Sequence, residues 1–168
     1  SGSVPREYLT NAIGFNSLGA ETTGINNTAV GSGALAAQAG ATGNTAVGKT
    51  AGDAITTGVN NTLVGLDAGG ALTTGASNIA VGKDALLVAT TTTNCTIVGT
   101  TAGDAITTGA DNTAIGFNSL GAATTGANNT AVGSGALAGV TIGTGNTAVG
   151  KTAADAVTTG INNTAVGL

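Results

Sequence analysis

The sequence predicts an all-β fold, a parallel β-solenoid that winds in coils of 17 residues. A five-residue pattern, Asn-Thr-Ala-Val-Gly or a near copy, recurs ten times at a constant spacing of 17 residues, without insertion or deletion. Self-similarity at one short period is typical of solenoids, whose repeats bury their apolar faces against their neighbours. We call the last residue of each copy the landmark glycine. These residues are Gly14, Gly31, Gly48, Gly65, Gly82, Gly99, Gly116, Gly133, Gly150 and Gly167.

The solenoid of about ten repeats is expected over residues 11–168, and residues 1–10 are expected to be an N-terminal tail or a cloning remnant. A second, longer period overlies the first. Residues 14–19, Gly-Phe-Asn-Ser-Leu-Gly, return at 116–121, and residues 51–55 return at 102–106 and, with changes, at 153–157. We interpret this period as duplication of a block of several coils. Nine coil steps of roughly 4.8 Å predict a rod of about 43 Å.

The residues before each landmark glycine have the composition of a covered β-strand. Three columns run through the repeats. The Val column is Ile13, Val30, Val47, Val64, Val81, Val98, Ile115, Val132, Val149 and Val166. The Ala column is Ala12, Ala29, Ala46, Leu63, Ala80, Ile97, Ala114, Ala131, Ala148 and Ala165. The Thr column is Thr28, Thr45, Thr62, Ile79, Thr96, Thr113, Thr130, Thr147 and Thr164. β-Branched residues favour strands, and alternation puts Thr and Val on one face and Ala on the other.

Because both faces are apolar or small, each of them needs cover. We expect the Val column to fill the interior of the coil and the Ala column to face the axis of a trimer, since an exposed apolar stripe of this length marks an interface. On this interpretation Ala80→Glu breaks the trimer more readily than a substitution of Lys83.

The segment after the landmark glycine is expected to form a second strand whose interior volume is shared between two positions. Where the fourth residue after the glycine is Leu, as at Leu35, the seventh is not a large aliphatic residue, as at Gln38. Where the fourth is Gly, as at Gly103, the seventh is large, as at Ile106. Only the coil with Leu137 and Val140 has both. A close-packed interior would enforce such a trade.

Thr-Thr-Gly closes many coils, and an Asn column follows it. The Asn column is Asn27, Asn44, Asn61, Asn78, Asn112, Asn129, Asn146 and Asn163, with Cys95 as the exception. Identical amides stacked at strand spacing can hydrogen-bond along the stack. The Thr column is expected to add a ladder of hydroxyls beside it.

Composition excludes several classes of function. The 168 residues carry a net charge of −4, with 7% charged residues, and the four cations are scattered, so no nucleic-acid partner is expected. No apolar run approaches the roughly 20 residues of a membrane span, so no membrane insertion is expected. Histidine is absent, which removes most metal and acid–base sites. The single cysteine, Cys95, cannot form an intrachain disulfide and is interpreted as a tolerated substitution.

The acidic residues do not have the spacing of a hydrolase site. Asp53, Asp104 and Asp155 share a column but are three coils apart, roughly 14 Å, which is wider than the about 5–9.5 Å that separates glycosidase carboxylates. Asp67 and Asp84 lie on adjacent coils, where Lys83 favours a solvated charged face. The calcium-binding nonapeptide is missing. We therefore expect no enzyme, catalytic residue, cofactor or metal.

Phe15 and Phe117 follow landmark glycines and are interpreted as exposed corners. Carbohydrate stacking is the alternative.

The repeat resembles two known sets. Residues 27–34, Asn-Thr-Ala-Val-Gly-Ser-Gly-Ala, resemble the Ser-Val-Ala-Ile-Gly-x-x-Ala repeat of trimeric autotransporter adhesin heads. Residues 124–133 and 158–167, Thr-Thr-Gly-x-Asn-Asn-Thr-Ala-Val-Gly, are similar to repeats of bacteriophage tail-fibre-like proteins. The resemblance covers residues 11–168 and implies a left-handed β-roll in each chain and a parallel homotrimer. The strict period favours the phage-fibre set, because adhesin-head repeats are shorter and vary in length.

The expected function is structural: a rigid spacer or adhesion shaft of a trimeric surface fibre, extracellular, on a virion tail or a bacterial cell. A host receptor or glycan would then be bound by a region outside these residues. The alternatives are an ice-binding β-solenoid, since flat Thr arrays order water, and a self-assembling extracellular filament built through open strand edges. Against ice binding, Thr28 shares its face with Val30, which is expected to be buried.

Overall fold

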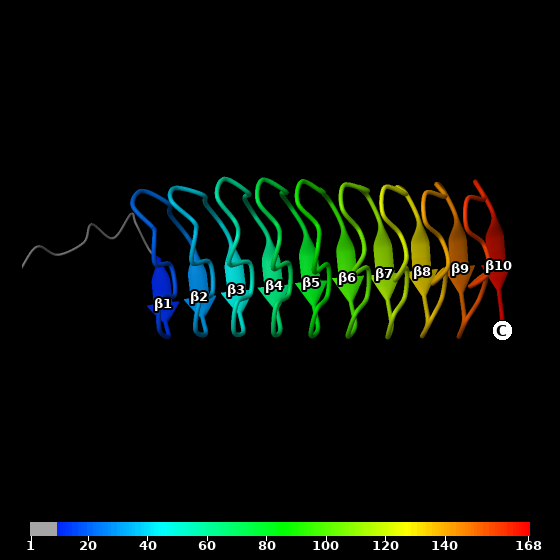
Figure 1. Cartoon of the computed structure of the whole chain (residues 1–168), viewed down its shortest axis with the longest axis horizontal. Helices are drawn as coiled ribbons and strands as arrows, with labels where there is room; N and C mark the ends of the chain where they lie inside the picture. Colours follow the sequence, from blue (N-terminus) through cyan, green and yellow to red (C-terminus); the bar gives the residue numbers. More distant parts are fainter. Residues whose placement is uncertain (1–9) are drawn as a thin grey trace, which may run out of the picture.

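The computed structural model describes residues 10–168 and confirms an all-β solenoid of 17-residue coils. Ten short parallel strands form a single sheet, in sequence order from β1 to β10 (Figure 1). The strands are β1 (Asn11–Ile13), β2 (Thr28–Val30), β3 (Thr45–Val47), β4 (Thr62–Val64), β5 (Ile79–Val81), β6 (Thr96–Val98), β7 (Thr113–Ile115), β8 (Thr130–Val132), β9 (Thr147–Val149) and β10 (Thr164–Val166). Of the expected tail, residues 1–9 lie outside the described residues.

The strands pair in the register that the columns predict. Thr28 pairs with Thr45, Ala29 with Ala46 and Val30 with Val47, and the same pairing continues along the sheet. Each landmark glycine then brings one coil into close contact with the next. At Gly99, φ is +141°, and a Cβ atom would lie 2.4 Å from the carbonyl oxygen of Gly116. No other residue type fits this position, which explains why the glycine recurs in every coil.

The predicted assignment of the strand faces is wrong. The Ala column, from Ala29 to Ala148, is fully buried inside the coil, whereas no member of the Val column is buried. The interior is narrow, because a strand of three residues closes the coil and the wall behind it already supplies large aliphatic side chains. Where that wall carries a large side chain, a methyl group fits the remaining space and an isopropyl group does not. The Thr and Val columns therefore form the outer face of the sheet.

The predicted second strand is also wrong, because turns form the opposite wall. Three positions in each coil adopt left-handed backbone conformations, as at Thr50 with φ of 54°, Leu35 with φ of 51° and Asn60 with φ of 58°. Backbone hydrogen bonds between coils hold this wall together, as between Leu35 N and Ala51 O at 3.1 Å and between Ala122 N and Ala138 O at 3.1 Å. The solenoid thus has one sheet, backed by a column of turns.

The trade of volume in the interior is confirmed. Large side chains from either of the two predicted positions are buried, among them Leu35, Leu86, Ile55 and Ile106. A Cβ atom on Gly103 would lie 2.9 Å from Cδ1 of Ile106 and 3.3 Å from Cδ1 of Ile97. The Ala column therefore admits a large residue, Ile97, where the wall behind it carries glycine.

The asparagine ladder is confirmed as well. Nδ2 of Asn61 donates to Oδ1 of Asn44 at 3.1 Å and to the carbonyl of Gly75 at 2.9 Å, and Oδ1 of Asn44 also accepts from the Asn61 backbone. Thr10 occupies the first place of this column and donates to the carbonyl of Gly24 at 3.2 Å. The hydroxyl ladder lies in a different column from the predicted one: Thr73 donates to the carbonyl of Thr90 at 3.0 Å, in the Thr-Thr-Gly turn.

Candidate interaction surface

The outer face of the sheet is the most regular surface of the described chain. It consists of the Thr and Val columns, which alternation points away from the interior on every strand. Val47 is 37% exposed and Ile115 is 40% exposed. Neither column contains a charged residue. The face is thus a long ribbon of methyl and hydroxyl groups that repeats at every coil.

A third exposed column borders this ribbon. We call it the corner column; it consists of the residues that directly follow the landmark glycines. Its members are Phe15, Ser32, Lys49, Leu66, Lys83, Thr100, Phe117, Ser134, Lys151 and Leu168, and all of them are exposed. The backbone ladder runs on past the strands into this column, since Gly99 N donates to Val81 O at 2.8 Å and Thr101 N to Lys83 O at 2.9 Å. The corner column is therefore a continuation of the sheet edge.

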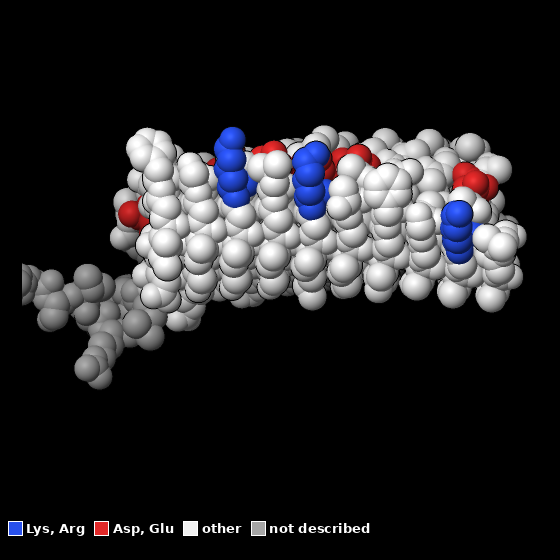
Figure 2. Space-filling model, turned by 90° about the horizontal axis from the view of Figure 1, so that it is seen from below, with Lys and Arg blue, Asp and Glu red and all other residues white. Residues whose placement is uncertain are grey.

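Charged side chains lie along this edge and leave the ribbon uncharged. In Figure 2 the lysines are spaced along the visible face, from its upper edge to a lower position near the right-hand end, and acidic side chains lie mostly along the upper edge. Lys83 forms an ion pair with Asp84 at 2.9 Å, with the lysine side chain 59% exposed. The ion pair raises the pKa of Lys83. This pair agrees with the predicted solvated charged face.

Four of the eight acidic residues form two loose pairs along four consecutive coils. Partial burial raises the pKa of Asp53, and the nearby carboxylate of Asp67 raises it further. Burial, followed by the charge of Asp84, likewise raises the pKa of Asp104. Asp67 is held by a hydrogen bond from the hydroxyl of Thr50. Within residues 10–168 no three His, Cys, Asp or Glu side chains are close enough together to hold a metal ion.

Cys95, Phe15, Phe117 and Asp155 lie apart from these acidic pairs. Cys95 is buried in the Asn column, where burial raises the pKa of its thiol. Its sulfur is 3.4 Å from the hydroxyl of Thr92. Phe15 and Phe117 are 84% and 61% exposed at the corner. Asp155 shares the column of Asp53 and Asp104, three coils further along the axis.

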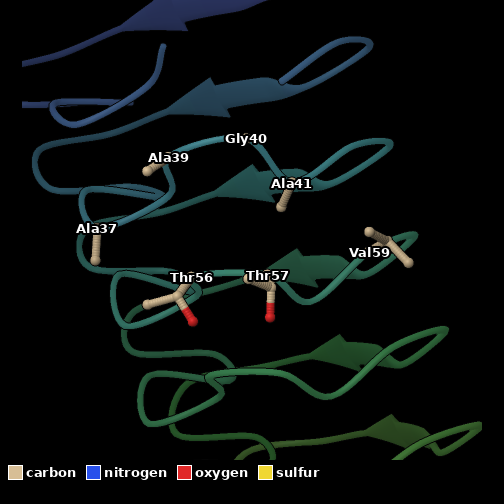
Figure 3. A pocket seen from close by; sticks show the side chains of 7 residues that line it. All are labelled: Ala37, Ala39, Gly40, Ala41, Thr56, Thr57 and Val59. Atoms are coloured by element: carbon tan, nitrogen blue, oxygen red, sulfur yellow. The ribbon is translucent and has the colours of Figure 1, made fainter. Parts of the chain in front are cut away.

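A hollow of about 350 Å³ interrupts the opposite side of the solenoid (Figure 3). It arises because Ala39, Gly40 and Ala41 stand where most coils have Thr-Thr-Gly, so smaller residues replace two threonines of the wall. Ala37 and, from the next coil, Thr56, Thr57 and Val59 complete its lining. The lining carries no charged or aromatic group and offers little for recognising a ligand.

Two features of the surface were missed in the sequence. The orientation of the Val column has no signal in the pattern, because both faces of the strand are apolar. The corner column did carry a signal: Phe15, Leu66 and Phe117 follow one another at intervals of 51 residues, three coils apart. The duplicated block obscured this signal. Phe15 and Phe117 lie in identical six-residue segments, whereas the segment around Leu66 has a different sequence.

Among the described residues, no helix has the length and apolar character that crossing a membrane requires. Comparison of the chain with protein-family models, with curated proteins and with solved structures finds no match. The functional interpretation therefore depends on the repeat and on the geometry of its outer surface.

Proposed function

We propose that this chain is a structural segment of a trimeric extracellular fibre, a rigid spacer or shaft in which three parallel copies associate through the outer face of the sheet. The observation that carries the proposal is the uncharged ribbon of the Thr and Val columns, which extends along the whole sheet from β1 to β10. Exposed apolar stripes of this kind mark interfaces. The resemblance of the repeat to fibre and adhesin-head repeats supports the number three.

The internal construction suits a mechanical role. Backbone hydrogen bonds between successive coils run along the axis, and the buried amide ladder adds side-chain bonds in the same direction. No buried side-chain nitrogen or oxygen of the described residues lacks a hydrogen-bond partner. Each coil is thus tied to its neighbours on the sheet side and on the turn side, and bending would strain both.

The corrected faces change which substitution separates the copies. Ala80 is completely buried inside the coil, so Ala80→Glu would damage the fold itself. Val47→Glu is the better test, because it places carboxylates of neighbouring copies together on the outer face, where like charges repel. Val88→Glu is the matched control: Val88 is 40% exposed, against 37% for Val47, but lies in the turn wall.

Light scattering measures the outcome directly. The unmodified chain and Val88→Glu are expected at three times the chain mass of 15.5 kDa, and Val47→Glu at one chain mass with an unchanged circular dichroism spectrum. A monomeric unmodified chain at micromolar concentration would overturn the proposal.

Ice binding is the second candidate, and one observation now favours it. The objection from the sequence was that Val30 would be buried, but Val30 lies on the outer face beside Thr28. Hydroxyl and methyl groups therefore repeat together at the coil spacing, with Ile79 as the single break in the Thr column. A regular array of this kind can hold water in fixed positions.

Thermal hysteresis distinguishes the two functions. A monomer with hysteresis that Thr96→Tyr abolishes and Thr91→Tyr preserves would support ice binding, since Thr96 lies on the ribbon and Thr91 in an exposed turn. A trimer without hysteresis supports the fibre.

A further inference from the structure

We propose that the corner column fixes the register between associated copies of this chain, through large apolar side chains that recur at every third coil. The inference rests on the proposed trimer. Phe15, Leu66 and Phe117 stand 51 residues apart, and Leu168 takes the next place in the series. Phe15, Leu66 and Phe117 are 84%, 37% and 61% exposed, so they lie on the surface at the edge of the ribbon. We call these four residues the apolar corner residues.

The ribbon by itself leaves the register undetermined. The Thr and Val columns present nearly the same side chains at every coil, so sliding one copy by a single coil of roughly 4.8 Å replaces each contact by an equivalent one. Flat, repetitive faces of this kind are prone to slippage unless some feature specifies against it. A fibre with a defined length and tip needs such a feature.

The corner column supplies the missing distinction. Ser32 and Lys49 separate Phe15 from Leu66, and Lys83 and Thr100 separate Leu66 from Phe117. In copies without stagger, each apolar corner residue is level with the same residue of its neighbours. A slip of one or two coils sets every one of them against Lys, Ser or Thr, which exposes apolar surface and removes water from polar groups. A slip of three coils restores the match but leaves three coils at each end uncovered.

A closed ring of three copies favours the unstaggered state for a second reason. Rotation about a three-fold axis relates the copies, so they run parallel and the same residue lies at the same height in each. The lysines of the corner column do not prevent this arrangement, since long charged side chains can lie along a surface with their ammonium groups in water. Lys83 already points its ammonium group to Asp84 of its own chain.

The area of contact also requires the corner column. The ribbon is about 7 Å wide, because two residue steps separate the Thr column from the Val column. Over a length of about 43 Å its contact area is roughly 300 Å² per copy. The sum for two copies, about 600 Å², is in the range of crystal-packing contacts. Extending the contact two steps further, to the corner column, raises the sum to about 1,100 Å², above the roughly 1,000 Å² expected of a biological interface.

Spin-label distances measure the register. The label is attached at Thr108→Cys, an exposed turn position, in a chain that carries Cys95→Ser. Unstaggered copies give one narrow distance between labels. In the variant Phe15→Ser, Leu66→Ser, Phe117→Ser, we expect either several distances that reflect slips in steps of roughly 4.8 Å, or dissociation to monomers. Serine already occupies this column at Ser32 and Ser134, so the coils tolerate it.

The control removes the same number of side chains from the same column. Lys49→Ser, Lys83→Ser, Lys151→Ser is expected to keep the trimer mass and the single distance. The inference is overturned if the apolar-corner variant stays trimeric with an unchanged single distance, or if the unmodified trimer already shows several distances. A monomeric unmodified chain overturns the proposed function, and the inference with it; the mass separates that result from a failure of the register alone.

Discussion

Cys95 shows how strictly a single side chain is fitted to its place in this solenoid. From Asn27 onward all the other coils have an Asn at this position, and the residue three places earlier is usually glycine, whose missing Cβ leaves room for the amide: a Cβ on Gly109 would lie 3.2 Å from Nδ2 of Asn112. In the coil of Cys95 that earlier residue is Thr92. Thr92 also donates to the carbonyl of Gly109, which an Asn amide would otherwise approach. Thr92 and Cys95 thus replace the Gly and Asn of other coils as a compensating pair.

This pairing predicts strong coupling between the two positions. Cys95→Asn alone crowds Thr92, and Thr92→Gly alone leaves a cavity and removes a hydrogen bond, so each is expected to lower the free energy of unfolding by about 1–2 kcal/mol. The double variant restores the ladder between Asn78 and Asn112 and is expected to be at least as stable as the parent. Urea denaturation of all four chains measures the coupling; additive effects would show that the two residues are independent.

The acidic pairs make a prediction about pH. The pKa of Asp53 is raised above its ordinary value of 3.8, by burial and by Asp67. A carboxyl group with a raised pKa binds protons more readily when folded, so its contribution to stability is present below pH 3.8 and is lost as the pH rises through the folded pKa. Asp53→Asn is therefore expected to raise the melting temperature at pH 7 and to leave it nearly unchanged at pH 3. An equal gain at both values would show that charge is not the cause.

Within a coil, strand and turn wall share one interior volume, and this predicts which substitutions compensate each other. Gly103→Leu introduces a side chain next to Ile97 and Ile106 and is expected to cost about 1–3 kcal/mol by overpacking. The backbone is not the obstacle, since Leu86 adopts a φ of 56° at the equivalent position. Adding Ile97→Ala and Ile106→Ala reproduces the arrangement of Ala80, Leu86 and Ala89 one coil earlier.

The triple variant is therefore expected to recover most of the loss, as measured by urea denaturation. A triple variant less stable than Gly103→Leu would contradict the shared volume, because the loss of the two isoleucine side chains would then create a cavity and not relieve overpacking.

The same element shows how far the sequence determines the fold. The period, the strand positions, the amide ladder and the volume trade at Leu35 and Ile106 were predictable, since each depends on spacing or on the sum of side-chain sizes. The direction of Val30 was not, because an apolar residue on a three-residue strand can face either side. Only the size of the interior, which the turn wall sets, decides between Ala29 and Val30. The turn wall itself could not be predicted, because residue type gives no reason to expect Leu in a left-handed conformation.

Over the whole molecule, stability comes from contacts between neighbouring coils, because each strand pairs only with the strands before and after it. Such a chain behaves as a one-dimensional stack in which a unit can be removed if its neighbours fit each other. Deletion of residues 118–134 removes 17 residues, joins Phe117 to Gly135 and brings Leu137 to the place of Leu120. We expect this chain to unfold in one transition, a few degrees below the parent.

Deletion of residues 118–133, one residue fewer, is the control. Every column after the junction is then displaced by one position relative to the coils before it, which directs Val149 toward the interior and Ala148 outward unless the coil at the junction bulges. We expect the C-terminal coils to melt in a separate transition at a lower temperature. Circular dichroism during heating measures both transitions. If the two deletions melt alike, the order of the columns does not hold the stack in register, and the 17-residue period would describe the history of the sequence and not its packing.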